Sequence, residues 1–102
     1  MGNNGIDEAL KIKLLKEVKG KLKILWEEED EFLNELIESS YYYFHRNSSN
    51  LDLNTDLFVR GLLKERVRYE WNNALDEFET NFSKEIGAFL WEAGLEVDAD
   101  AK

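Results

Sequence analysis

The side chains that most often catalyse reactions or bind metals are few and scattered in this chain. His45 is the only histidine, cysteine is absent, and no pair of carboxylates stands at helical spacing around His45. A single histidine at the end of a predicted helix more often caps carbonyl groups than binds a metal or transfers a proton. No glycine-rich phosphate loop and no serine, histidine and aspartate set can be recognised. The sequence therefore predicts a protein that is not an enzyme and that binds no cofactor or metal.

The net charge of the chain limits the kinds of molecule that it can bind. It carries 22 acidic and 13 basic side chains, for a formal net charge of −9. An acidic surface disfavours general binding to nucleic acid, because neutralising phosphates requires basic side chains. The same electrostatics suit a wall past which DNA must slide, since basic contacts would hold the phosphates. No apolar run is long enough to span a bilayer and the start has no signal-peptide pattern, which favours synthesis and folding in a cytoplasm.

The elements that position these side chains are predicted to be helices. The chain has 102 residues, no proline and 43% hydrophobic residues, and its abundance of Leu, Glu and Lys favours helices over strands. We expect an all-α fold, a small bundle of about four helices with one long central helix. Residues 1–94 are predicted to form a single helical domain. The acidic residues 95–102 are predicted to form a mobile C-terminal tail, because they include too few large side chains to pack alone.

The long central helix is predicted over Asn54 to Phe82, where apolar residues recur at three- and four-residue steps. One apolar face consists of Phe58, Leu62 and Tyr69, and the other of Leu63, Val67, Trp71, Leu75 and Phe78. At about 1.5 Å per residue the helix would reach roughly 40 Å, too long for shorter helices to surround. Part of its apolar surface is therefore expected to need a partner chain. Whether the helix breaks at Asn72 and Asn73, two poor helix formers, stays open.

Basic and acidic residues are segregated around the first predicted helix, Ile6 to Lys23. Six of the 13 basic residues lie on this helix, and an acidic segment, Glu27 to Glu31, follows it. Two interpretations stay open. The lysines can form the solvated face of an amphipathic helix and favour its C-terminal end, or the basic helix and the acidic loop can form an electrostatic seam between neighbouring subunits. For the second case the candidate interface residues are Lys19, Lys21, Lys23, Glu27 and Glu28.

Further candidate interface residues lie on the second and central helices. The second helix is predicted over Asp30 to Arg46, and Tyr42 and Tyr43 fall off its apolar stripe. An exposed pair of aromatic rings with polar tips suits a protein interface, and partial burial under a loop is the alternative. Arg66 and Arg68 are surrounded by acidic residues. This pattern argues against DNA recognition and favours a role as charge partners at a subunit interface.

A last short helix is predicted from Ser83, which would start it, to Gly94, which would stop it. The apolar side of this helix consists of Ile86, Phe89, Leu90 and Ala93. Trp91 lies off that side, where it is available to a partner.

The central region resembles a known family. The segment Leu63-Lys-Glu-Arg-Val-Arg-Tyr69, followed by Asn73, Phe78 and Asn81-Phe82, is similar to the phage head-tail connector family, the small head-completion or adaptor proteins of tailed phages. The segment Glu17 to Ile24, an acidic turn, and Asp30 to Ser39 resemble that family's first helix, loop and second helix. The similarity covers roughly Lys16 to Phe82, about two thirds of the chain.

The resemblance implies a structural protein of the virion, located at the head-tail interface and made in the cytoplasm of the bacterial host. Its copies would form a ring of about a dozen under the portal protein, extend the DNA channel, and link the capsid to a stopper or tail-completion protein. DNA would pass through without sequence-specific binding, and no membrane would be involved. In relatives the C-terminal segment reaches onto the portal. The docking residues implied here are Phe89, Leu90, Trp91, Leu95 and Val97.

A second class of function stays open. A helix with two apolar faces can also belong to a small cytoplasmic regulatory module that binds a partner helix. The two classes differ in their assemblies, because only the connector is expected to form a ring on phage portals.

Overall fold

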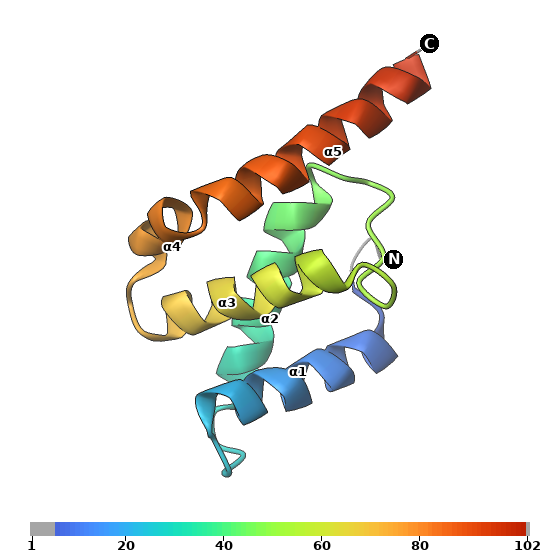
Figure 1. Ribbon diagram of the computed structural model, residues 1–102. Helices are drawn as coiled ribbons and strands as arrows, with labels where there is room; N and C mark the ends of the chain where they lie inside the picture. The colour runs from blue at the N-terminus through green and yellow to red at the C-terminus, as the bar shows by residue number, and fades with distance from the viewer. Residues whose placement is uncertain (1–5, 102) are drawn as a thin grey trace.

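The computed structural model describes the backbone of residues 6–101 and the side chains of residues 6–94. This part of the chain consists of helices joined by loops and contains no strand, which confirms the expected all-α fold (Figure 1). The helices are α1 (Glu8–Leu22), α2 (Asp30–His45), α3 (Leu57–Trp71), α4 (Leu75–Asn81) and α5 (Ser83–Ala101). Five helices therefore replace the expected four, because the predicted central helix is divided into α3 and α4.

Carboxylate caps begin two of the helices, α1 and α3. Asp7 accepts a hydrogen bond from the backbone N–H of Leu10 at 2.8 Å and begins α1. Asp56 accepts one from the N–H of Val59 at 3.1 Å and begins α3. Both caps satisfy backbone donors that have no partner within the helix. The prediction that the central helix starts at Asn54 is therefore wrong, because Asp56 caps it.

The break between α3 and α4 lies at Asn72 and Asn73. Asn73 adopts a left-handed backbone conformation, with φ of 59°, which asparagine tolerates better than most residues. The N–H of Ala74 then donates to the Tyr69 carbonyl at 2.8 Å, and the N–H of Asn73 donates to the Glu70 carbonyl at 3.1 Å. These two bonds close the end of α3 in the Schellman arrangement. The expectation of one long central helix is therefore wrong.

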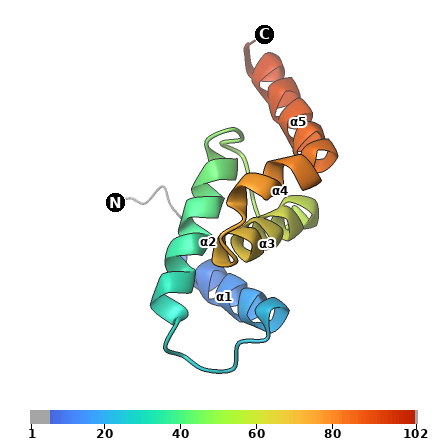
Figure 2. The same ribbon diagram turned by 90° about the vertical axis from the view of Figure 1, so that its left-hand side faces the viewer.

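The core lies where α3 crosses α2 and passes between α1 and the α4–α5 pair (Figures 1 and 2). Leu62, Leu63 and Val67 of α3 are buried, so both apolar faces of this helix are covered largely within the subunit. Phe58 is the exception and remains half-exposed. The central helix therefore has little need of a partner chain to cover it, because breaking the helix folds its second half back onto the body.

The last helix begins immediately after α4 and passes through Gly94 to Ala101, so Gly94 does not end it. Ile86, Phe89 and Ala93 are buried against the body, and the Phe89 ring meets Phe44 of α2 edge to face at 5.2 Å. Figure 2 shows the far end of α5 extending beyond the other helices. This extension makes the molecule less compact: its radius of gyration is 14.1 Å, whereas a compact domain of this size has about 13 Å. Because of this extension we call α5 the arm.

No helix within residues 6–101 is both long enough and apolar enough to cross a lipid bilayer.

Candidate interaction surfaces

Three of the charged residues predicted at a subunit seam pair within their own chain. Lys19 binds Asp30 at the start of α2, with 2.6 Å between Nζ and Oδ1. Lys21 of α1 and Arg68 of α3 both bind Glu65, each at 2.7 Å. The pairs of Lys19 and Lys21 tie α1 to α2 and α3, and the pair of Arg68 lies within α3. A role of these residues between subunits stays a prediction. A contact with a neighbouring subunit would require each residue to share its present acidic partner or to exchange it for one on the neighbour.

Arg66 is also engaged inside the subunit. Its side chain is 13% exposed, and Nη1 donates to Oγ of Ser40 at 3.0 Å. The guanidinium carbon lies 4.3 Å from the centre of the Tyr43 ring, the geometry of a cation–π contact. Glu70 is 3.9 Å away. Burial lowers the pKa of Arg66, but an arginine remains charged. The packing therefore depends on these contacts to hold a buried charge.

The two tyrosines predicted as an interfacial pair have different environments. Tyr42 is 63% exposed. Tyr43 is partly buried beneath Arg66, and its hydroxyl lies 3.5 Å from a carboxylate oxygen of Glu79. Burial raises the pKa of Tyr43. Only Tyr42 offers most of its ring to a partner, and its role at an interface stays a prediction. Tyr43 is covered by Arg66 of α3 and not by a loop.

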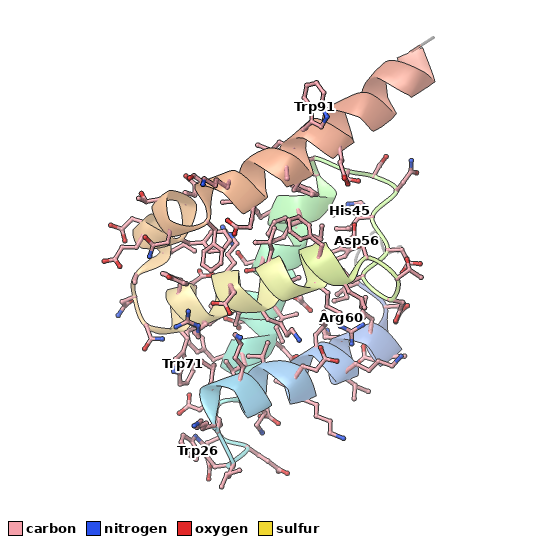
Figure 3. The ribbon with its side chains drawn as sticks, in the orientation of Figure 1. Trp26, His45, Asp56, Arg60, Trp71 and Trp91 are labelled. Carbon is pink, nitrogen blue, oxygen red and sulfur yellow. The ribbon has the colours of Figure 1, made fainter. Side chains whose placement is uncertain are left out.

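A second charged network was not predicted from the sequence. Arg60 of α3 lies against α1 (Figure 3) and donates from Nε to Glu17 at 3.0 Å and from Nη2 to the other carboxylate oxygen. Lys64 binds the same carboxylate at 3.2 Å. The hydrogen bond from Arg60 is the main cause of the lowered pKa of Glu17. Glu17 and Arg60 are 43 residues apart, so no local spacing reveals the pair.

The loop between α1 and α2 exposes apolar as well as charged side chains. Lys23, Glu27 and Glu28 of the predicted seam are exposed. Leu25 is 92% exposed and Trp26 is 49% exposed. Large apolar side chains in such positions suit a contact with another molecule.

Two shallow hollows lie on the surface of α1 and α2. The α1 groove has a volume of about 520 Å³, and the α2 hollow has a volume of about 510 Å³. The α1 groove is lined by Ile12, Leu15, Lys16, Lys19, Gly20, Ile24 and Leu25. The α2 hollow is lined by Ile6, Glu35, Glu38, Ser39, Tyr41 and Tyr42. Both are mainly apolar, but the charged residues of the first are basic and those of the second are acidic.

The arm carries the residues expected to dock on a portal. Leu90 is 45% exposed and Trp91 is 70% exposed, and Figure 3 shows Trp91 pointing away from the body. Phe89, in contrast, is a core residue with 5% of its surface exposed. Leu95 and Val97 lie on α5 outside the residues whose side chains are described. Leu90 and Trp91 are therefore the described candidates for a docking contact.

His45 does not cap a carbonyl group through its side chain. Its ring stacks on Tyr41 with 5.3 Å between ring centres, and it forms no side-chain hydrogen bond among the described residues. Within the same part of the chain, no three acidic or histidine side chains gather to hold a metal ion. The surfaces with a shape and composition suited to recognition are thus the two hollows and the arm.

Comparison of the chain with protein-family models, curated proteins and solved structures finds no match. Membership of the phage connector family therefore stays an expectation that depends on the resemblance of the quoted segments.

Proposed function

We propose that this chain is a structural subunit of a phage head-tail connector. About a dozen copies form a ring under the portal protein, extend the DNA channel and present the opposite surface to a stopper or tail-completion protein. The observation that carries this proposal is the arm, which packs on the body through Ile86, Phe89 and Ala93 and exposes Leu90 and Trp91 on its other side. An exposed tryptophan beside a leucine is the kind of anchor that binds strongly when a partner pocket covers it.

The positions of the resemblance residues support this proposal. Tyr69, Phe78 and Phe82 form an aromatic cluster, with ring centres 5.3 to 5.9 Å apart. The side chain of Asn81 donates to the Tyr69 hydroxyl at 3.0 Å, and Asn73 closes the end of α3. Tyr69, Phe78, Asn81 and Phe82 thus meet beside the joint from which α5 departs, and Asn73 lies at the turn before α4. Part of the resemblance therefore lies in the region of the fold that sets the direction of the arm.

The acidic charge is consistent with the channel role. A net charge of −9 favours a wall that does not retain DNA phosphates. Ion pairs within the subunit also occupy part of the basic charge, at Lys11, Lys19, Lys21, Arg60, Lys64, Arg66 and Arg68. These side chains are less available to the phosphates of passing DNA than unpaired ones.

Binding to the portal protein of the same phage tests the proposal. Purified portal rings are incubated with the wild-type chain, and binding is measured by co-sedimentation. Trp91→Ala should weaken binding at least about tenfold, because it removes an exposed anchor of the kind that dominates interfaces. Leu57→Ala is the matched control, because Leu57 is an exposed apolar residue at the start of α3 and lies outside the arm and both hollows. Equal binding by the wild type and Trp91→Ala would contradict docking through the arm.

The competing function is a small regulatory module that binds a partner helix. It is favoured by Leu57 and Phe58, adjacent residues at the start of α3 that are 69% and 49% exposed. This module would form a stable one-to-one complex with a protein that is not a portal. Genes for portal, capsid and tail proteins beside the coding gene would favour the connector instead.

A further inference from the structure

We infer that neighbouring copies of this chain bind head to tail, with the α1 groove of one copy covering the α2 hollow of the next. This inference rests on the proposed ring, because a ring requires each subunit to present two different, mutually complementary surfaces. Lys19 in the groove and Tyr42 in the hollow were already predicted at a subunit interface, whereas the charges assigned to the contact here, Lys16 and Glu35, were not.

Charge complementarity is the first observation in its favour. Lys16 lines the α1 groove and Glu35 lines the α2 hollow. Both side chains are exposed, and neither forms an ion pair among the described residues. Lys13 on α1 and Glu31 on α2 are also exposed, and neither forms an ion pair among the described residues. Two copies of a chain with net charge −9 repel each other overall, so a stable contact requires a local match of opposite charges.

Exposed apolar surface is the second observation. Ile12 and Leu25 of the groove are 62% and 92% exposed, and Tyr42 of the hollow is 63% exposed. Tyr42 combines an apolar ring with a polar tip that can remain at the edge of a contact. Covering these side chains removes apolar surface from water, which favours association. The floors of the groove and the hollow are apolar as well, so contact is not confined to the charged rim.

A second copy of this chain can cover both the groove and the hollow, because it supplies the opposite charge and the apolar surface that each of them needs from a partner. Lys19 of the groove pairs with Asp30 and Glu38 of the hollow pairs with Lys11 inside the chain. Among the described residues, the unpaired charges are therefore Lys16 in the groove and Glu35 in the hollow. An acidic partner suits the first and a basic partner suits the second. Every copy of the chain carries one of each. Because the two surfaces differ, one contact leaves a free groove at one end and a free hollow at the other, and assembly can continue until the ring closes.

The test is a charge exchange between two variants of the full chain. Lys16→Glu places an acid in the groove, and Glu35→Lys places a base in the hollow. Each variant alone brings like charges together, and its association constant should fall at least about tenfold. When the two variants are mixed in equal amounts, the new acid of one variant faces the new base of the other at one contact, and the unaltered Lys16 and Glu35 meet at the next. Assembly should then recover.

Sedimentation velocity at protein concentrations up to about 1 mM measures this association. The wild type should grow beyond a dimer of the 12.0 kDa chain, and added salt should weaken the growth. Lys84→Glu and Glu77→Lys are the matched controls, because both residues are exposed, form no ion pair among the described residues and lie on α5 and α4. They should assemble as the wild type does.

The inference is overturned by a wild type that stays monomeric or stops at a dimer, by single variants that assemble normally, or by a mixture that does not recover. Portal binding is measured in parallel and separates this inference from the proposed function. A chain that self-assembles through these surfaces but ignores portals contradicts the connector alone. A chain that binds portals but does not self-associate in sedimentation contradicts the head-to-tail contact alone.

Discussion

Arg66 of α3 donates a hydrogen bond to the hydroxyl of Ser40 on α2, with 3.0 Å between Nη1 and Oγ. Ser40 has no exposed surface, and its small side chain leaves room for the guanidinium between the two helices. A residue that the sequence suggested as an interface charge therefore stabilises the contact between α2 and α3. The other face of the guanidinium packs on Tyr43, so the charge is enclosed on more than one side.

Replacing Ser40 by Ala should lower the free energy of unfolding by about 1–2 kcal/mol, because a buried guanidinium N–H loses its partner. Ser39→Ala changes an exposed neighbour on the same helix and should stay within about 0.5 kcal/mol of the wild type. Urea unfolding of both variants at the same concentration makes the comparison. Equal stability of the two would mean that water replaces the Ser40 hydroxyl without cost.

Removing the Phe78 ring should cost about 3–5 kcal/mol, because it leaves a cavity in the core. Phe78 has no exposed surface and contacts both Tyr69 and Phe82. Trp71→Ala should cost less, since Trp71 is only partly buried and its nearest ring, Phe32, is 6.0 Å away. Thermal unfolding of the two variants tests this order. A larger loss for Trp71→Ala would show that the core is assigned wrongly.

Local patterns predicted the helical class and the first two helices well. The expected bounds Ile6 to Lys23 and Asp30 to Arg46 differ from those of α1 and α2 by two residues or fewer, because apolar periodicity and acidic helix starts are encoded in neighbouring residues. The same periodicity continues across Asn72 and Asn73, so the sequence suggested a possible break there but could not decide it, since residues on either side of a turn can both face one core.

The candidate surfaces were harder to predict because they depend on contacts between distant residues. The charges of Lys19, Lys21 and Arg68 indicated an interface, but their partners Asp30 and Glu65 are reached only after the helices pack. Trp91 was correctly placed off the apolar side of its helix. The α1 groove requires the turn at Lys23 to bring Ile24 and Leu25 back beside the helix, and no local spacing specifies that return.

Lys23 is a position where a substitution should increase stability. Its backbone is left-handed, with φ of 61°, and it closes the end of α1. Lys23→Gly should raise the free energy of unfolding by about 0.5–1 kcal/mol, because glycine adopts this conformation without the strain of a side chain. Lys16→Gly, within the same helix, should lower it by about 1 kcal/mol. Urea unfolding measures both, and a loss of stability in Lys23→Gly would contradict the assigned turn.

Acid should destabilise the protein through Glu17. Its pKa lies below the ordinary value of 4.5 because Arg60 and then Lys64 donate hydrogen bonds to its carboxylate. A carboxyl group with a lowered pKa in the folded state stabilises that state above its unfolded pKa, and this contribution disappears as the pH falls through the folded pKa. The free energy of unfolding should therefore decrease between about pH 5 and pH 2.

Glu17→Gln tests the origin of that decrease. The variant should be less stable at neutral pH, by about 1–2 kcal/mol, because Arg60 and Lys64 lose a charged acceptor. It should also lose less stability on acidification than the wild type does. Glu35→Gln is the control, since Glu35 is exposed and forms no ion pair among the described residues. Parallel pH profiles for Glu17→Gln and the wild type would assign the acid sensitivity to other carboxylates.

The proposed function requires this chain to assemble as a ring on a phage portal. Electron microscopy of purified portal rings, imaged alone and after incubation with the wild-type chain, is the decisive measurement. The connector predicts an added ring of density on one face of the portal, surrounding a continuous central channel. Portal images that are unchanged by an excess of the folded chain would overturn the proposal.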